Sequence, residues 1–179
     1  MTTWNISKQV NHPVRVEFLG IGEEVTPNTM SKMKDIINSS IKDYYVRRWA
    51  EKIVENAGKD DYSKVNFIYD FIASHVKYLK DPYHVELLKT PKVSLQLFEV
   101  GETPSLDCDD MAILSLSLIK SIGIPVALRA TSYKPDGKFS HVYGLVFIKS
   151  QGWIPFDLVK FQGLGWEAPN MTRVLDMEV

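Results

Sequence analysis

The segment from Asp107 to Ile122 constrains the fold more than any other part of the sequence. On a helix, its apolar residues cover nearly the whole circumference, and Gly123 ends the run. These residues are Met111, Ile113, Leu114, Leu116, Leu118, Ile119 and Ile122. A helix that is apolar all round is buried on most of its sides. We therefore expect a helix at the centre of the fold, with the other elements packed around it.

Apolar residues recur every three or four positions in three segments before the central helix, and this spacing predicts amphipathic helices. The first begins after Pro27, where Asn28 and Thr29 are good capping residues. The other two span about 43–56 and 61–75. The apolar stripe of the last one consists of Val65, Ile68, Tyr69 and Ile72. The first half of the chain is therefore expected to be mainly helical.

Alternation of apolar and polar residues predicts strands before and after these helices. Residues 13–19 alternate in this way and end at Gly20. After the central helix, strand-like runs span 125–131, 141–148 and 153–159, and turn-forming residues separate them. We expect these later runs to form an antiparallel sheet.

Two segments lack a clear period. Residues 77–104 contain three X-Pro pairs, each of which pushes the residue before proline out of helical geometry, so we expect an irregular connector with short elements. The tail over 161–179 shows no period either. No linker divides the chain, and we expect one domain over 1–179 with a helical N-terminal part over 1–63. The predicted fold class is α+β.

The charges are nearly balanced, with 21 basic and 22 acidic residues and a formal net charge of −1. Such a chain has no long-range positive field for phosphate backbones or anionic lipid, so we expect no nucleic-acid partner. No stretch approaches the ~18 apolar residues of a membrane-spanning helix, and we expect no membrane partner. The first residues lack the basic and apolar pattern of a signal peptide, which predicts a cytoplasmic protein.

Cys108 is the only cysteine, so an internal disulfide and cysteine-rich zinc sites are excluded by count. We expect no metal and no cofactor. If Asp107 is the N-cap, Cys108 is the first helical residue, where free N–H groups and the helix dipole lower the pKa of a thiol. Asp110 then fits a carboxylate in the first turn, and both carboxylates oppose thiolate formation. Activation of Cys108 must therefore rely on a histidine.

Two downstream residues supply partners for this thiol. His141 opens one predicted strand and Asp157 lies in the next. A thiolate, an imidazole that exchanges its proton and a carboxylate that orients the imidazole make a nucleophilic triad. His141 and Asp157 meet only if the residue numbers paired across this hairpin have an even sum. We therefore predict a turn with an odd number of residues, and Gly152 in a left-handed conformation.

At these residues the sequence resembles the transglutaminase-like superfamily of papain-type thiol enzymes, in its compact bacterial and bacteriophage forms. The resemblance is strongest over 64–160. The matching segments are 107–114, 122–125, 141–143 and 153–157, with 76–82, Pro91 and Leu95 as a lead-in. The resemblance implies a helix packed on an antiparallel sheet, with Cys108 as nucleophile, His141 as general base and acid, and Asp157 as its orienting residue.

The resemblance also implies an activity: acyl transfer or amide hydrolysis through a thioester, of transglutaminase, peptidase or deamidase type, on a protein or peptide substrate and without a cofactor. Members of the family often have glycine two residues before the cysteine, where this chain has Leu106. A bulkier residue there narrows substrate access or displaces the Cys108 N–H from an oxyanion. Gln96, Tyr78 and Tyr83 are candidates for the second oxyanion donor by their chemistry alone.

The second hypothesis is a catalytically silent module that keeps the fold for binding or for structure. In a bacteriophage, such a module would be a virion or assembly component, and the protein would be virion-associated. Leu106 and the acidic residues beside Cys108 are the features that favour this hypothesis. The sequence does not indicate an oligomeric state.

Overall fold

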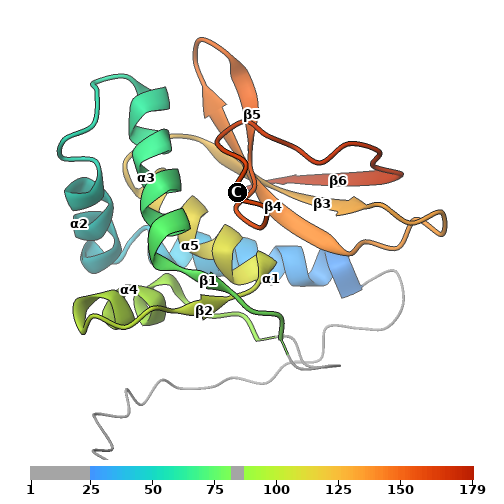
Figure 1. Cartoon of the computed structure of the whole chain (residues 1–179), viewed down its shortest axis with the longest axis horizontal. Helices are drawn as coiled ribbons and strands as arrows, with labels where there is room; N and C mark the ends of the chain where they lie inside the picture. Colours follow the sequence, from blue (N-terminus) through green and yellow to red (C-terminus); the bar gives the residue numbers. More distant parts are fainter. Residues whose placement is uncertain (1–24, 82–86) are drawn as a thin grey trace, which may run out of the picture.

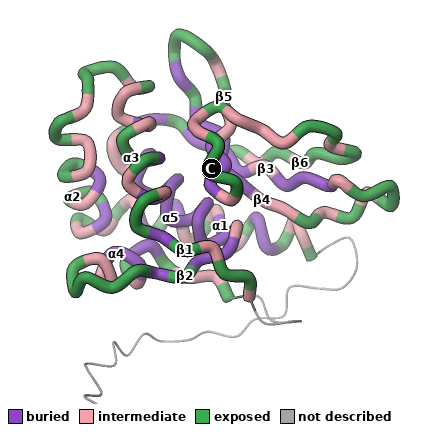
Figure 2. The backbone as a smooth tube through the Cα atoms, in the orientation of Figure 1, coloured by how far each residue is buried: buried purple, intermediate pink, exposed green. Residues whose placement is uncertain are grey.

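Helix α5 (Cys108–Ser121) lies between a group of helices and a sheet in the computed structural model, which describes residues 25–81 and 87–179 (Figure 1). Every residue from Asp109 to Ile119 is buried, which confirms the predicted central helix. Figure 2 shows this burial along α5, whereas the surrounding helices are buried on one side only. Gly123 follows the helix with a φ of 90°, a left-handed conformation that glycine adopts without strain. The strand predicted over 13–19 lies outside the described residues.

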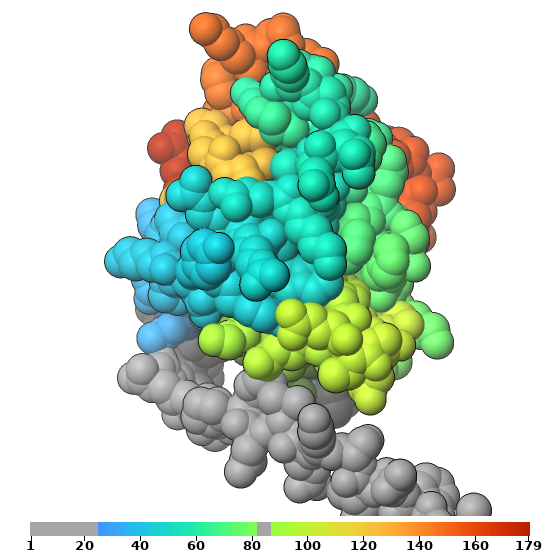
Figure 3. Space-filling view, turned by 90° about the vertical axis from the view of Figure 1, so that its left-hand side faces the viewer, coloured from blue at the N-terminus to red at the C-terminus, as the bar shows by residue number. Residues whose placement is uncertain are grey.

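Four helices surround α5 on the side away from the sheet, and Figure 3 views the molecule from this helical side. They are α1 (Val25–Ser40), α2 (Tyr44–Ile53), α3 (Asp61–His75) and α4 (Pro91–Glu99). Helix α3 has the predicted bounds and buries the predicted stripe. No helix in the described part of the chain is long and apolar enough to cross a membrane.

The start of α1 differs from the prediction. The structure describes α1 from Val25 onward, so the helix already includes the two residues before Pro27 and does not start after it. Proline has no N–H to donate to the preceding turn, so helices accommodate it best near their start. Thr29 therefore lies inside the helix, where its hydroxyl donates to the Val25 carbonyl at 2.9 Å. Local capping signals placed the start too late.

The connector contains more regular structure than its prolines indicate. Strand β1 (Lys77–Tyr78) pairs in parallel with β2 (Ser105–Leu106), and α4 lies between them in the sequence. Thr90 is extended, with φ −70° and ψ 147°, and Pro91 is the first residue of α4. Proline therefore starts this helix, as it often does. The β1–β2 pair places Tyr78 beside Leu106, two residues before Cys108.

The sheet is antiparallel, with the strand order β5-β4-β3-β6. Its strands are β3 (Val126–Ser132), β4 (His141–Ile148), β5 (Gly152–Phe156) and β6 (Arg173–Glu178). The structure confirms the α+β class and the sheet of the three predicted runs, although β5 ends at Phe156 and not at 159. Strand β6 was not predicted. It is short and half-exposed, and its hydrogen bonds to β3 stabilise it where its own sequence pattern is weak.

The two faces of the sheet have different neighbours. The inner face packs on α5. Gly144 on β4 lies so close to this helix that a Cβ added to it would be 2.5 Å from Leu116 Cδ2. Val126, Leu128, Ala130 and Val146 are buried in the main core on this face. The outer face carries His141 and Tyr143 on β4 and their register partners Thr131 and Arg129 on β3. A small second cluster of Ala127, Tyr143 and Leu145 lies on the outer face.

Candidate active site

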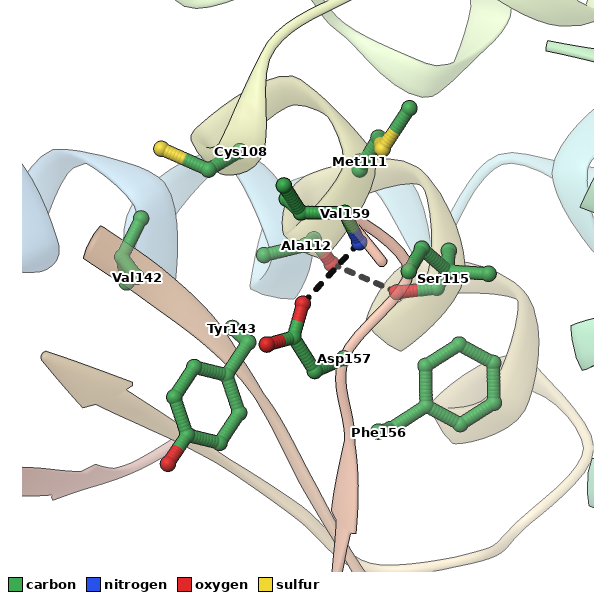
Figure 4. Close-up of a pocket in the computed structure, with 10 residues that line it drawn as sticks. Cys108, Met111, Ala112, Ser115, Val142, Tyr143, Phe156, Asp157 and Val159 are labelled. Atoms are coloured by element: carbon green, nitrogen blue, oxygen red, sulfur yellow. Dashed lines mark hydrogen bonds between the residues drawn. The ribbon is translucent and has the colours of Figure 1, made fainter. Parts of the chain in front are cut away.

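Cys108 occupies the position predicted for it. Asp107 is the N-cap of α5, and its side chain accepts a hydrogen bond from Asp110 N at 3.3 Å. Cys108 is the first residue of the helix and is half-buried. Its N–H belongs to the first turn, where amides have no acceptor within the helix. In Figure 4 its side chain projects from the end of α5 at the rim of a pocket.

His141 and Asp157 form a direct pair. His141 Nε2 lies 2.8 Å from Asp157 Oδ2, and the side chains are 14% and 2% exposed. Asp157 Oδ1 accepts a second hydrogen bond, from Val159 N at 3.0 Å, which Figure 4 shows as a dashed line. A carboxylate only accepts hydrogen bonds, so in the neutral imidazole Nε2 carries the proton and Nδ1 is the acceptor. The pair therefore fixes the tautomer that can take a proton from a thiol.

The β4–β5 register brings this pair together as predicted. Gly144 lies opposite Phe156 and Ile148 opposite Gly152, so the paired numbers have an even sum. The turn contains the three residues 149–151, and Gly152 has a φ of 80°. One further step in this register places Asp157 opposite Tyr143. Asp157 itself follows the last residue of β5, and the prediction that it lies within the strand was wrong by one residue.

Cys108 and Asp157 line the same pocket, whereas His141 is not among its lining residues. Its lining comes from α5, β4 and the end of β5 (Figure 4). The lining residues are Cys108, Met111, Ala112, Ser115, Val142, Tyr143, Phe156, Asp157, Leu158 and Val159. Leu106 is not among them. It is 1% exposed and belongs to the main core, so its bulk faces the interior and does not narrow this pocket.

The three candidate oxyanion donors have different surroundings. Burial, and then the charges of Cys108 and Asp107, raise the pKa of Tyr78 to about 12, so its phenol is a protonated donor near the thiol. Gln96 lies on α4, and its Oε1 is buried without a hydrogen-bond partner among the described residues. Tyr83 lies outside the described residues. Tyr78 is thus the candidate that the β1–β2 pairing places near the start of α5, opposite Leu106.

Asp110 has a partner that the sequence did not indicate. Its fully buried carboxylate accepts from Lys89 N at 2.7 Å and pairs with Lys89 Nζ. Burial raises the pKa of Asp110 to about 6, and Lys89 opposes this shift. This ion pair holds the segment before α4 against the first turn of α5. The Asp110 carboxylate therefore connects two segments, in addition to complementing the helix dipole as predicted.

Tyr69 holds the backbone next to the pair. Its hydroxyl donates to the Asp157 carbonyl at 3.3 Å and accepts from Gly163 N at 3.0 Å. Its ring meets Phe156 edge to face, with the centroids 5.3 Å apart. The sequence placed Tyr69 in the apolar stripe of α3, and no local pattern marked its hydroxyl. Among the described residues, no group of three or more His, Cys, Asp or Glu side chains is arranged to hold a metal ion.

Solved structures with this fold include proteins assigned as proteases. A proposed protease from Parabacteroides distasonis is 13% identical, with a TM-score of 0.57 over 81% of this chain and 31% of that chain. A proposed cysteine protease from Cytophaga hutchinsonii is 19% identical, with a TM-score of 0.50 over 81% of this chain and 53% of that chain. This chain therefore spans about a third and about half of their lengths. At such identities the likeness concerns the fold.

No curated protein matches the sequence. The model of the transglutaminase-like superfamily matches residues 47–158, which include Cys108, His141 and Asp157. This match spans more than half of the 179 residues, and the fold of α5 packed on an antiparallel sheet agrees with it. The chain belongs to the transglutaminase-like superfamily.

Proposed function

We propose that this protein is a cysteine acyltransferase or amide hydrolase that acts through Cys108, His141 and Asp157. The observation that carries the proposal is the 2.8 Å contact between His141 Nε2 and Asp157 Oδ2 beside the pocket that Cys108 lines. A buried carboxylate orients this imidazole, and the thiol at the helix N-terminus lines the same pocket as that carboxylate. A thiol nucleophile needs an oriented base of this kind within reach.

In the first step, His141 Nδ1 accepts the thiol proton and the Cys108 thiolate attacks the carbonyl carbon of an amide. The new C–S bond gives a tetrahedral intermediate with its negative charge on oxygen. The His141 imidazolium then donates its proton to the departing nitrogen, the C–N bond breaks, and a thioester remains. Asp157 stabilises the imidazolium through its bond to Nε2.

In the second step, water or a primary amine attacks the thioester. His141 takes a proton from the attacking group and returns it to the Cys108 sulfur as the C–S bond breaks. Water yields a carboxylic acid, and an amine yields a new amide. Peptide cleavage, glutamine deamidation and cross-linking share these steps, and a protein or peptide is the substrate class that we propose.

The oxyanion needs donors aimed at the carbonyl oxygen. The Cys108 N–H is one, because it lies in the first turn of α5. We assign the second to Tyr78, whose protonated phenol is electrostatically coupled to Cys108. Changing Tyr78 to Phe should therefore slow acylation more than it slows alkylation of the thiol, because alkylation forms no oxyanion.

The test is the pH dependence of Cys108 alkylation by iodoacetamide, compared with that of the His141→Ala variant. We expect the wild-type rate to reach half its maximum below the ordinary thiol value of about 8.5. His141→Ala should move this midpoint upward and slow the reaction at pH 6.5 by more than about tenfold. His75→Ala is the matched control, since His75 lies on α3 and contacts Phe71.

A wild-type midpoint near 8.5 that His141→Ala leaves unchanged would favour the silent binding or structural module. Mass spectrometry of Cys108 after incubation with candidate peptides and glutamine substrates then identifies the acyl group. An adduct that Cys108→Ser abolishes supports turnover. Its hydrolysis or its transfer to an added amine separates the two reaction types.

A further inference from the structure

A row of polar side chains crosses the outer face of the sheet and ends at the candidate site. Asp176 on β6 pairs in register with Arg129 on β3, and Arg129 pairs with Tyr143 on β4. The β4–β5 register, extended one residue beyond Gly144 and Phe156, places Asp157 next in this row. The row therefore leads from the C-terminal strand to the carboxylate that holds His141.

Hydrogen bonds connect Asp176 to Arg129, and Glu167 connects Arg129 to Tyr143. Arg129 binds Asp176 through two parallel bonds of 2.7 Å, from Nε and Nη2. Its Nη1 donates to Glu167 Oε1 at 2.8 Å, and the Tyr143 hydroxyl donates to the same oxygen. Tyr143 is only 2% exposed. Charge-assisted bonds to a paired carboxylate are stronger than neutral ones, and the two-pronged geometry adds orientation.

The protonation states suit this arrangement. Burial, and then the hydrogen bond to Glu167, raise the pKa of Tyr143 well above its ordinary value. Asp176 and then Glu167 raise the pKa of Arg129. The phenol therefore stays a donor and the guanidinium stays charged at physiological pH. Glu167 accepts from both and fixes the phenol end of the Tyr143 ring.

The Tyr143 ring reaches the imidazole of His141. The two ring centroids lie 5.3 Å apart, with the planes inclined by 30°. His141 is thus contacted by the Tyr143 ring and by the Asp157 carboxylate at Nε2. In Figure 4 the Tyr143 side chain points away from α5. Its hydroxyl donates to Glu167. A ring fixed at its hydroxyl limits how far the imidazole can turn.

We propose that Tyr143 is a positioning residue for His141, and that Glu167 and Arg129 hold Tyr143 in place. This inference rests on the proposed function, since it assigns the imidazole a catalytic role. Glu167 and Asp176 lie beyond the segment 47–158 that matches the family. Cys108, His141 and Asp157 lie within that segment. Residues from the C-terminal part of the chain thereby help to position the His141 imidazole.

The test compares Tyr143→Phe, Tyr143→Leu and Glu167→Gln in the full chain. Phe keeps the ring beside His141 and loses the hydroxyl, whereas Leu loses both. We expect Tyr143→Phe and Glu167→Gln to slow Cys108 alkylation at pH 6.5 by about fivefold, and Tyr143→Leu to slow it further. Their midpoints should move toward that of His141→Ala. Glu51→Gln is the charge-matched control, because it removes an exposed partner of Arg47 on α2.

A second readout is the NMR signal of the His141 ring Hε1 proton at fixed pH. Glu167→Gln should shift or broaden this signal, and Glu51→Gln should leave it unchanged. If Glu167→Gln and Tyr143→Phe only lower the unfolding temperature, and leave both the alkylation profile and the His141 signal unchanged, the row is merely structural and the inference is overturned.

The two proposals fail in different ways. If the alkylation profile of the wild-type protein does not respond to His141→Ala, the proposed function fails. The Hε1 signal still decides whether Glu167 positions the imidazole, because this signal does not depend on the thiol. A Glu167→Gln variant that behaves like Glu51→Gln in this spectrum overturns the positioning role on its own.

Discussion

The two faces of the sheet are formed by the same strands, yet different kinds of interaction stabilise them. On the inner face, Leu128 and Val146 are fully buried against α5, and Gly144 brings β4 close to Leu116. On the outer face, Arg129 and Tyr143 form ionic and hydrogen bonds with residues from the tail. Neighbouring residues of one strand thus take part in two different kinds of interaction.

This difference separates stability from chemistry. The inner face contributes buried apolar area, which stabilises the fold without regard to the direction of a contact. The outer face contributes directional bonds that place His141 and its partners. Changes on the inner face should therefore alter the free energy of unfolding more than the reactivity of Cys108, and changes near the site should do the reverse.

The largest effect on stability is expected from Leu128→Ala. Leu128 is fully buried on the inner face, and removing such a side chain costs about 2–5 kcal/mol. Denaturant unfolding measures the loss, and the alkylation midpoint of the folded fraction should not change. Val174→Ala is the control on β6, where the side chain is 44% exposed and the expected loss is below about 1 kcal/mol. Equal losses in the two variants would contradict the comparison.

Lys89→Met tests the link between the connector and α5. It leaves the buried Asp110 carboxylate without its cation, and we expect a loss of about 2 kcal/mol at pH 8. This is less than for a fully buried pair, because the Lys89 side chain is 32% exposed. Unfolding is measured at pH 8 and at pH 5.

The loss should shrink at pH 5. The pKa of Asp110 is about 6 in the folded protein and near 3.8 in the unfolded chain, so folded Asp110 is largely protonated at pH 5 and needs no cation. Without Lys89 the folded pKa rises further, and the variant loses more stability than the wild type as the pH rises through and above 6. The double variant with Asp110→Asn should show no such pH dependence from this pair.

Gly144→Ala adds a single methyl group to the inner face and tests how tightly this face packs on α5. The new Cβ would lie 2.5 Å from Leu116 Cδ2, so the core must move, and we expect a loss of about 1–3 kcal/mol. Combining it with Leu116→Ala should recover part of this loss, because the smaller side chain makes room. Additive losses in the double-mutant cycle would mean that the two residues do not conflict.

Asp107→Asn should change reactivity with little change in stability. Asparagine caps helices about as well as aspartate, so unfolding should change by less than about 0.5 kcal/mol. Removing a negative charge beside Cys108 favours the thiolate, and the alkylation midpoint should fall by about half a pH unit. Asp60→Asn, at the N-cap of α3, is the control that leaves this midpoint unchanged.

The sequence predicted the parts of the fold that depend on burial within one segment. The stripe of α3, the all-round apolar character of α5 and the alternation of β3 and β4 each report which sides of an element are buried. The even register of the β4–β5 hairpin followed from the requirement that His141 and Asp157 meet. These signals lie within short stretches, where periodicity is informative.

The contacts that sequence reasoning missed join segments far apart in the chain. Strand β6 depends on β3, and Glu167 became visible only through Arg129 and Tyr143. Lys89 lies 21 residues before its partner Asp110. No period within the tail or the connector records such pairings, because their free energy comes from partners that the local pattern does not contain.

The register of the β4–β5 hairpin has a consequence for how the site can be lost. A slip of this pairing by one residue would turn Asp157 to the other side of the sheet, away from His141, with every amino acid of the site unchanged. The site therefore depends on which residues of the two strands lie opposite one another as much as on the identity of Cys108, His141 and Asp157.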